Sequence, residues 1–87
     1  MTADAILSET LAILSRIAAS IRTPADVGPA TPLTDGGFWL DSVEILEVVV
    51  ACEERFGVVF DAEMDLTTET LKTVENLAAV IRAKKAG

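Results

Sequence analysis

LDSVEILEVVVACEERFG, residues 40–57, carries the signals for both ends of one helix. Asp41 is a good N-cap residue, and Glu44 follows it at the three-residue spacing of a capping box. At the other end, Arg55 suits the negative pole of a helix, and Gly57 suits the left-handed turn with which many helices end. We therefore predict a helix that begins directly after Asp41 and ends before Gly57.

A helical wheel of residues 43–56 shows two apolar stripes on this helix. The first spans about 100° of arc, which suits packing on a core, and comprises Ile45, Val48, Val49, Cys52 and Phe56. The second lies opposite and is mixed with acids: Val43, Leu46 and Val50 between Glu47, Glu53 and Glu54. Exposed apolar residues with an acidic rim predict a docking surface for a partner that is apolar at its centre and basic at its edge. In the alternative interpretation, the segment that follows the helix covers the second stripe and makes it part of the core.

The part of the chain before this helix predicts another helix and a long loop. Residues 3–22 have helical spacing, with a main stripe of Leu7, Leu11, Leu14, Ala18 and Ile21 that is widened by Ile6, Ile13 and Ile17. All three prolines and three of the five glycines then fall between Thr23 and Asp41, which predicts a flexible loop.

The part after the second helix predicts one further clear helix. Residues 73–85 combine the apolar spacing of a helix with basic residues at the C-terminal end. In the intervening segment, residues 58–72, Leu66 and Leu71 suit a short helical turn. The fold class is therefore an all-α bundle with a long first connection.

Composition excludes several classes of function. The chain has 87 residues, enough for one small domain, and its single cysteine and lack of histidine exclude a disulfide framework, a cysteine-cluster metal site and histidine-based catalysis. The net charge of −7 makes nucleic acid a poor partner and a basic protein surface a good one. With a short longest apolar run and an acid near the N-terminus, we expect neither membrane insertion nor a secretory signal, and a cytoplasmic monomer.

Ser42 stands at the first helical position, directly after Asp41 and the proline- and glycine-rich loop. Its hydroxyl should be accessible, and the N-terminus of a helix favours a phosphate group. The alternative is that Asp41 and Ser42 serve only to begin the helix.

The run from Leu40 to Glu47, followed by Glu53-Glu54-Arg55-Phe56-Gly57-Val58, resembles the acyl carrier protein family. The similarity covers nearly the whole chain, including the long first helix, the long loop and Thr73-Val74 at the start of the last helix. It implies a single carrier domain over residues 1–87, folded as a four-helix bundle with a long first loop and a short third helix.

The resemblance also implies a function. In this family the serine of the Asp-Ser motif, here Ser42 after Asp41, carries a phosphopantetheine arm whose thiol holds an acyl or aminoacyl group as a thioester. The implied partners are a phosphopantetheinyl transferase and acyl-loading, acyl-transfer or synthase enzymes with basic docking patches. These enzymes read the second helix, which corresponds to Val43, Glu44, Leu46, Glu47, Val50 and Glu54.

Three features depart from the carriers of fatty-acid synthesis, which usually have glycine three residues before the modified serine. This chain has Trp39 there instead. Leu40 directly before the Asp-Ser pair and ETLKTV at residues 69–74 resemble dedicated carriers, such as those of D-alanine, polyketide or peptide intermediates. One interpretation places Phe38 in the core and Trp39 beside Ser42 as an apolar shelf close to the cargo. In the other interpretation, Trp39 packs against the first helix as part of the core.

Two functions from other classes compete with the carrier. A small acidic helical adaptor would bind a partner through the second helix and need no prosthetic group. A minimal enzyme would use Ser42 or Cys52 as its nucleophile, but neither has a base to activate it, and Cys52 lies on the core stripe. We therefore expect a protein that is not itself an enzyme.

Overall fold

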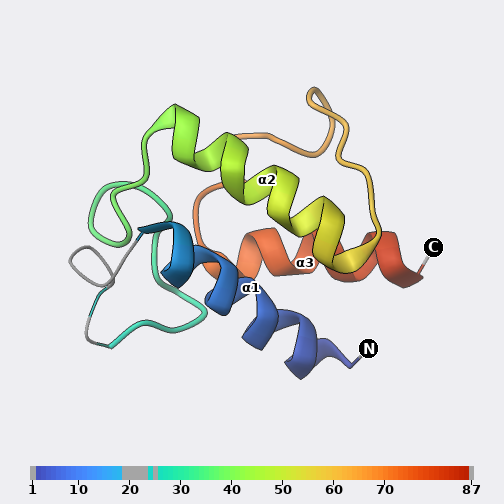
Figure 1. The fold of residues 1–87 in the computed structure, drawn as a ribbon, viewed down its shortest axis with the longest axis horizontal. Helices are drawn as coiled ribbons and strands as arrows, with labels where there is room; N and C mark the ends of the chain where they lie inside the picture. The colour runs from blue at the N-terminus through green and yellow to red at the C-terminus, as the bar shows by residue number, and fades with distance from the viewer. Residues whose placement is uncertain (1, 19–23, 25, 87) are drawn as a thin grey trace.

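The computed structural model describes residues 2–18, 24 and 26–86. Over these ranges its secondary structure is helical, and the helices are joined by long connections. The three helices are α1 (Ala3–Ala18), α2 (Ser42–Phe56) and α3 (Val74–Ala86) (Figure 1). The fold class and the three main helices are confirmed, and α2 has the predicted bounds. Of the first predicted helix, residues 19–22 lie outside the described residues.

The predicted short third helix, and with it the four-helix bundle, is wrong for the described part of the chain. Two isolated turns stand in its place, closed by hydrogen bonds from the Asp65 N–H to the Asp61 carbonyl (2.8 Å) and from the Leu71 N–H to the Thr67 carbonyl (3.1 Å). The side chain of Asp61 accepts hydrogen bonds from two nearby backbone N–H groups, and that of Thr67 accepts one. Asp61 and Thr67 each cap a separate turn as Asp41 caps α2, and because an N-cap residue has a non-helical backbone, the second cap at Thr67 interrupts a helix that would continue from the first turn.

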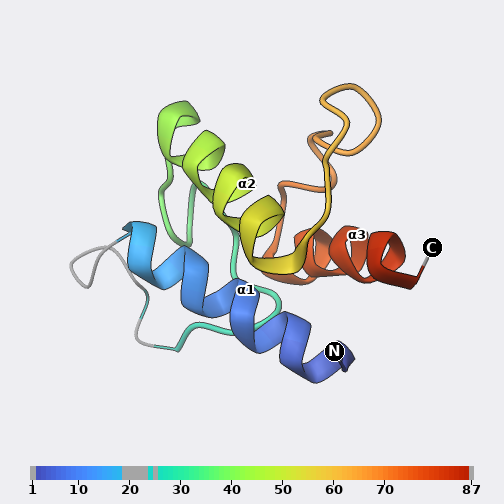
Figure 2. The same ribbon diagram turned by 45° about the vertical axis from the view of Figure 1, so that its right-hand side comes forward.

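The helices surround one core, and α1 contacts both α2 and α3. The connection between α2 and α3 rises as an open loop on the side of α2 away from α1 (Figures 1 and 2). No described helix is both long and apolar enough to cross a membrane.

The buried face of α1 is rotated relative to the predicted stripe. Leu7 and Leu11 of the predicted main stripe are only half-buried, and the fully buried positions are Ile6, Thr10, Ile13, Leu14 and Ala18. The reason is that α1 packs against two helices at once, so the centre of its buried face lies between them. Thr10 is tolerated there because its hydroxyl donates to the carbonyl of Ile6 at 2.7 Å.

The described part of the proline- and glycine-rich loop is fixed to the bundle, in contrast to the flexible loop that we predicted. Its Pro32 pairs with Thr73 in an isolated bridge. The Val74 N–H donates to the Thr31 carbonyl (3.1 Å), and the Glu75 N–H donates to the Pro29 carbonyl (2.8 Å). The loop thereby supplies acceptors to the first N–H groups of α3, which have none inside the helix.

Candidate functional site

The predicted capping box forms at the start of α2. Asp41 has an extended backbone, and its Oδ1 accepts a hydrogen bond from the Glu44 N–H at 2.8 Å. The Glu44 carboxylate in turn accepts from the Asp41 N–H at 3.1 Å. At the other end, Gly57 takes the left-handed conformation and its N–H donates to the Glu53 carbonyl at 3.0 Å. Both ends of the predicted helix are therefore confirmed.

Ser42 is the first residue of α2 and is exposed. Its hydroxyl makes no hydrogen bond to any described residue. Among the described residues, the backbone N–H groups of Ser42 and Val43 also have no hydrogen-bond acceptor. In the same turn, the N–H of Glu44 donates to the Asp41 side chain and the N–H of Ile45 donates to the Asp41 carbonyl. An accessible hydroxyl beside two open N–H groups, at the positive pole of a helix, fits a phosphate ester.

The loop that leads into Ser42 is built on buried side chains and backbone hydrogen bonds. Phe38 and Leu40 are buried, and their N–H groups donate to the carbonyls of Pro32 and Leu33, each at 3.0 Å. Gly37 passes so close to Pro32 that a Cβ on this glycine would lie 2.0 Å from the proline oxygen. The backbone just before Ser42 is therefore held in one path.

Trp39 is not a core residue, so the interpretation that buries it is wrong, whereas Phe38 is fully buried as expected. The side chain of Trp39 is 58% exposed, and its φ of 56° lies in the left-handed region. A non-glycine residue adopts that conformation at a cost of about 1–2 kcal/mol. This backbone requirement suits the glycine that we noted at this position in fatty-acid carriers.

The second apolar stripe of α2 is exposed. Val43, Leu46 and Val50 are 63%, 61% and 51% exposed, and Glu47 and Glu54 beside them are exposed as well. The alternative in which the following segment covers this stripe is wrong, because the open loop after α2 leaves it uncovered.

The other predicted acids of α2 have structural partners. Glu44 belongs to the capping box, and the Glu53 carboxylate accepts a hydrogen bond from the Phe60 N–H at 2.8 Å. Cys52 is buried in the core, and burial together with the neighbouring charge of Glu53 raises the pKa of its thiol to about 12. Since the thiolate is the reactive form, this side chain is inert near neutral pH. Within the described ranges, no cluster of three or more acidic or cysteine side chains could hold a metal ion.

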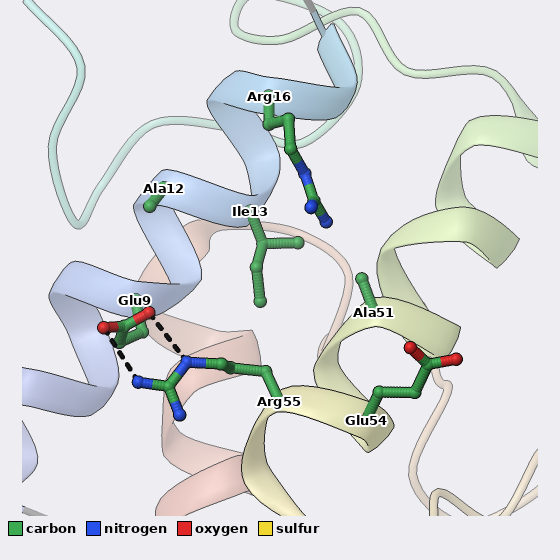
Figure 3. Close-up of a pocket in the computed structure, with 7 residues that line it drawn as sticks. All are labelled: Glu9, Ala12, Ile13, Arg16, Ala51, Glu54 and Arg55. Carbon is green, nitrogen blue, oxygen red and sulfur yellow. Dashed lines mark hydrogen bonds and ion pairs between the residues drawn. The ribbon is translucent and has the colours of Figure 1, made fainter.

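A groove between α1 and α2 was not predicted from the sequence (Figure 3). Two hollows of about 390 and 430 Å³ run together along it, and both are lined by Arg16, Ala51 and Glu54. One end is closed by a two-point ion pair, in which Nε and Nη2 of Arg55 each lie 3.0 Å from a carboxylate oxygen of Glu9. From helical spacing alone, Arg16 can be placed opposite the main apolar stripe of its own helix. The spacing does not predict that Arg16 lies beside α2.

Residues 11–81 match the family model for a phosphopantetheine attachment site. Comparisons with curated proteins and with solved structures give no significant match. Members of this family carry phosphopantetheine covalently on a serine, and they work with phosphopantetheinyl transferases and synthase enzymes. The match spans most of the chain and confirms the family expected from residues 40–47. The chain belongs to the family of carrier domains that bear a phosphopantetheine attachment site.

Proposed function

We propose that residues 1–87 form one carrier domain, which holds an acyl or aminoacyl intermediate as a thioester on a phosphopantetheine arm attached to Ser42. The observation that carries the proposal is the exposed Ser42 hydroxyl at an open helix N-terminus. The other described serines, Ser8 and Ser15, lie inside α1. The thiol of the arm supplies the reactive group, so the domain needs no nucleophile or base of its own and is not an enzyme.

Each neighbour of Ser42 has a part in this proposal. Asp41 and Glu44 hold the first turn of α2 in place through their capping box. The N–H groups of Ser42 and Val43, which have no acceptor among the described residues, are available to donate to the ester phosphate. The Ser42 hydroxyl gives up its proton to the transferase as its oxygen bonds to the phosphopantetheine phosphorus of coenzyme A, and the bond from this phosphorus to the nucleotide phosphate breaks, which releases adenosine 3′,5′-bisphosphate.

The exposed stripe of α2 is the proposed docking surface for partner enzymes. It has an apolar centre (Val43, Leu46 and Val50) and an acidic rim (Glu47, Glu54 and the half-buried Glu44). A partner with a basic patch around an apolar centre complements this surface. We further propose that the exposed Trp39 lies close to the arm and its cargo, and that the carrier serves a specialised pathway rather than general fatty-acid synthesis.

The test of the attachment site is the intact mass of the protein after incubation with a broad-specificity phosphopantetheinyl transferase and coenzyme A. We expect the wild type to gain one phosphopantetheine group and Ser42→Ala to gain none. Ser8→Ala is the matched control, since Ser8 is also exposed, and it should be modified like the wild type.

Modification of Ser42→Ala would contradict the assigned site. An unmodified wild type would contradict the carrier function and leave the adaptor, which binds partners through α2 without a prosthetic group.

A further inference from the structure

The groove between α1 and α2 carries charges of both signs. Ile13 and Ala51 point into it from the two helices (Figure 3). On the α2 side the rim is acidic, with Glu47 and Glu54. On the α1 side stands Arg16, whose guanidinium extends toward α2 in Figure 3.

Arg16 makes no ion pair with any described residue, although it lines both hollows together with Glu54. Arg55, the other arginine that lines the groove, contacts the Glu9 carboxylate through both Nε and Nη2. This pairing raises the pKa of Arg55 and lowers that of Glu9, first through the hydrogen bond between them. Arg55 therefore joins the two helices, whereas the charge of Arg16 is available to a partner.

The charge of Arg16, beside an acidic rim, restricts which partner surface can bind over the groove. A partner surface with only basic side chains would complement Glu47 and Glu54 but would bring like charge onto Arg16. Like charges brought together in an interface are strongly unfavourable. The complementary surface therefore has basic side chains with one carboxylate among them.

The groove lies within reach of any protein that acts on Ser42. Glu47 follows Ser42 by five residues on the same helix, a distance of about 7.5 Å along its axis. An ordinary interface buries about 800 Å² on each partner, which corresponds to a patch roughly 30 Å across. A footprint of that size centred on Ser42 extends about 15 Å along α2, so it covers the part of the groove at Glu47 and Val50, whereas Glu54 lies about 18 Å from Ser42 along the axis.

We infer that the α1–α2 groove is part of the surface that binds the phosphopantetheinyl transferase, and that Arg16 receives a carboxylate of that enzyme. The inference rests on the proposed attachment at Ser42 and extends the docking surface from α2 onto α1. Arg16 has no part in the chemistry; it selects a partner surface of mixed charge.

The test compares rates of modification by the phosphopantetheinyl transferase of the source organism, with coenzyme A as the donor. Wild type, Arg16→Lys and Arg16→Glu are compared with Lys72→Glu, which makes the same change in net charge at an exposed position outside the groove. Circular dichroism and thermal unfolding show whether each variant folds, because Arg16 also lies in the last turn of α1.

We expect Arg16→Glu to lower kcat/KM about tenfold, mainly through KM. Arg16→Lys should stay within about threefold of the wild type and Lys72→Glu within about twofold. If Arg16→Glu does not fold, Arg16→Gln replaces it, with an expected loss of about fivefold.

A modification rate of Arg16→Glu that equals or exceeds that of the Lys72→Glu control would overturn the inference. If the acidic face merely attracts a basic enzyme, Arg16→Glu makes that face more acidic and should react as fast as Lys72→Glu or faster. That result, with a wild type that is modified normally, removes the role of Arg16 and leaves the carrier function intact. A wild type that this enzyme does not modify overturns both.

Discussion

The two long connections of the molecule, one leading into α2 and one leaving it, are held in different ways. The first is held by buried side chains, Leu33, Phe38 and Leu40, and by backbone hydrogen bonds to itself and to α3. The second has one buried aromatic side chain, Phe60, with Val58, Leu66 and Leu71 only half-buried against the core, and it also has polar contacts such as the ion pair of Asp65 with Lys84 (2.6 Å).

The difference has a functional reason under the proposed carrier role. Ser42 follows the first connection directly, so the contacts that fix this connection also fix the serine that receives the arm. The second connection begins fifteen residues later, after the last residue of α2. We therefore expect changes there to leave the position of Ser42 intact.

The largest expected effect comes from removing the aromatic anchor of the first connection. Phe38→Ala should lower the free energy of unfolding by about 3–5 kcal/mol, since the ring is fully buried. Met64→Ala in the second connection should change it by less than about 0.5 kcal/mol, because Met64 is 80% exposed. Urea unfolding measures both values, and equal losses would contradict the comparison.

A smaller effect is expected from the close approach of backbone at Gly37. Gly37→Ala should cost about 2–3 kcal/mol, because the new Cβ would meet the Pro32 backbone. Gly28→Ala is the matched control in the same loop, since a Cβ there has no atom within 4 Å, and it should be neutral or slightly stabilising. Urea unfolding of the two variants gives the difference; a stable Gly37→Ala would show that the loop can take another path.

A change of about 1 kcal/mol is expected at Trp39. Trp39→Gly should be more stable than Trp39→Ala by about this amount, because only glycine adopts a φ of 56° without steric cost. Thermal unfolding of the pair measures the backbone effect separately from the lost ring. If the alanine variant is as stable as the glycine variant, the left-handed backbone is not a constraint at this position.

The smallest effect concerns pH and the second connection. A hydrogen bond from the Asp61 N–H, together with the hydrogen bond and charge of Lys84, holds the pKa of Asp65 below its ordinary value. A lowered folded-state pKa stabilises the fold above the ordinary carboxyl pKa of about 4, and this contribution is lost as the pH falls through the lowered value.

Asp65→Asn should therefore lower the melting temperature at pH 7, and the difference from the wild type should vanish in acid. Glu63→Gln, which removes the same charge from a nearby exposed side chain without an ion pair to a described residue, should leave the melting temperature unchanged at pH 7. A difference for Asp65→Asn that persists in acid would show that its cause is not the carboxylate charge.

The sequence by itself determined the features that depend on near neighbours in the chain. The capping box at Asp41 and Glu44, the left-handed Gly57 and the exposed start of α2 at Ser42 each involve residues within one helical turn. Propensity and spacing describe such contacts directly, so these predictions are confirmed. The family could also be predicted, because its motif lies in the same short stretch.

Only the tertiary structure decided the features that depend on distant segments. The buried face of α1 is set by two helices together, and the exposure of Trp39 depends on how Phe38 fills the core. The predicted short helix between α2 and α3 is replaced by two turns, and the first of them is tied to α3 by the ion pair of Asp65 with Lys84, which is distant in the sequence. The groove that brings Arg16 beside α2 exists only once α1 and α2 have packed, since no local pattern states which helix a given face will meet.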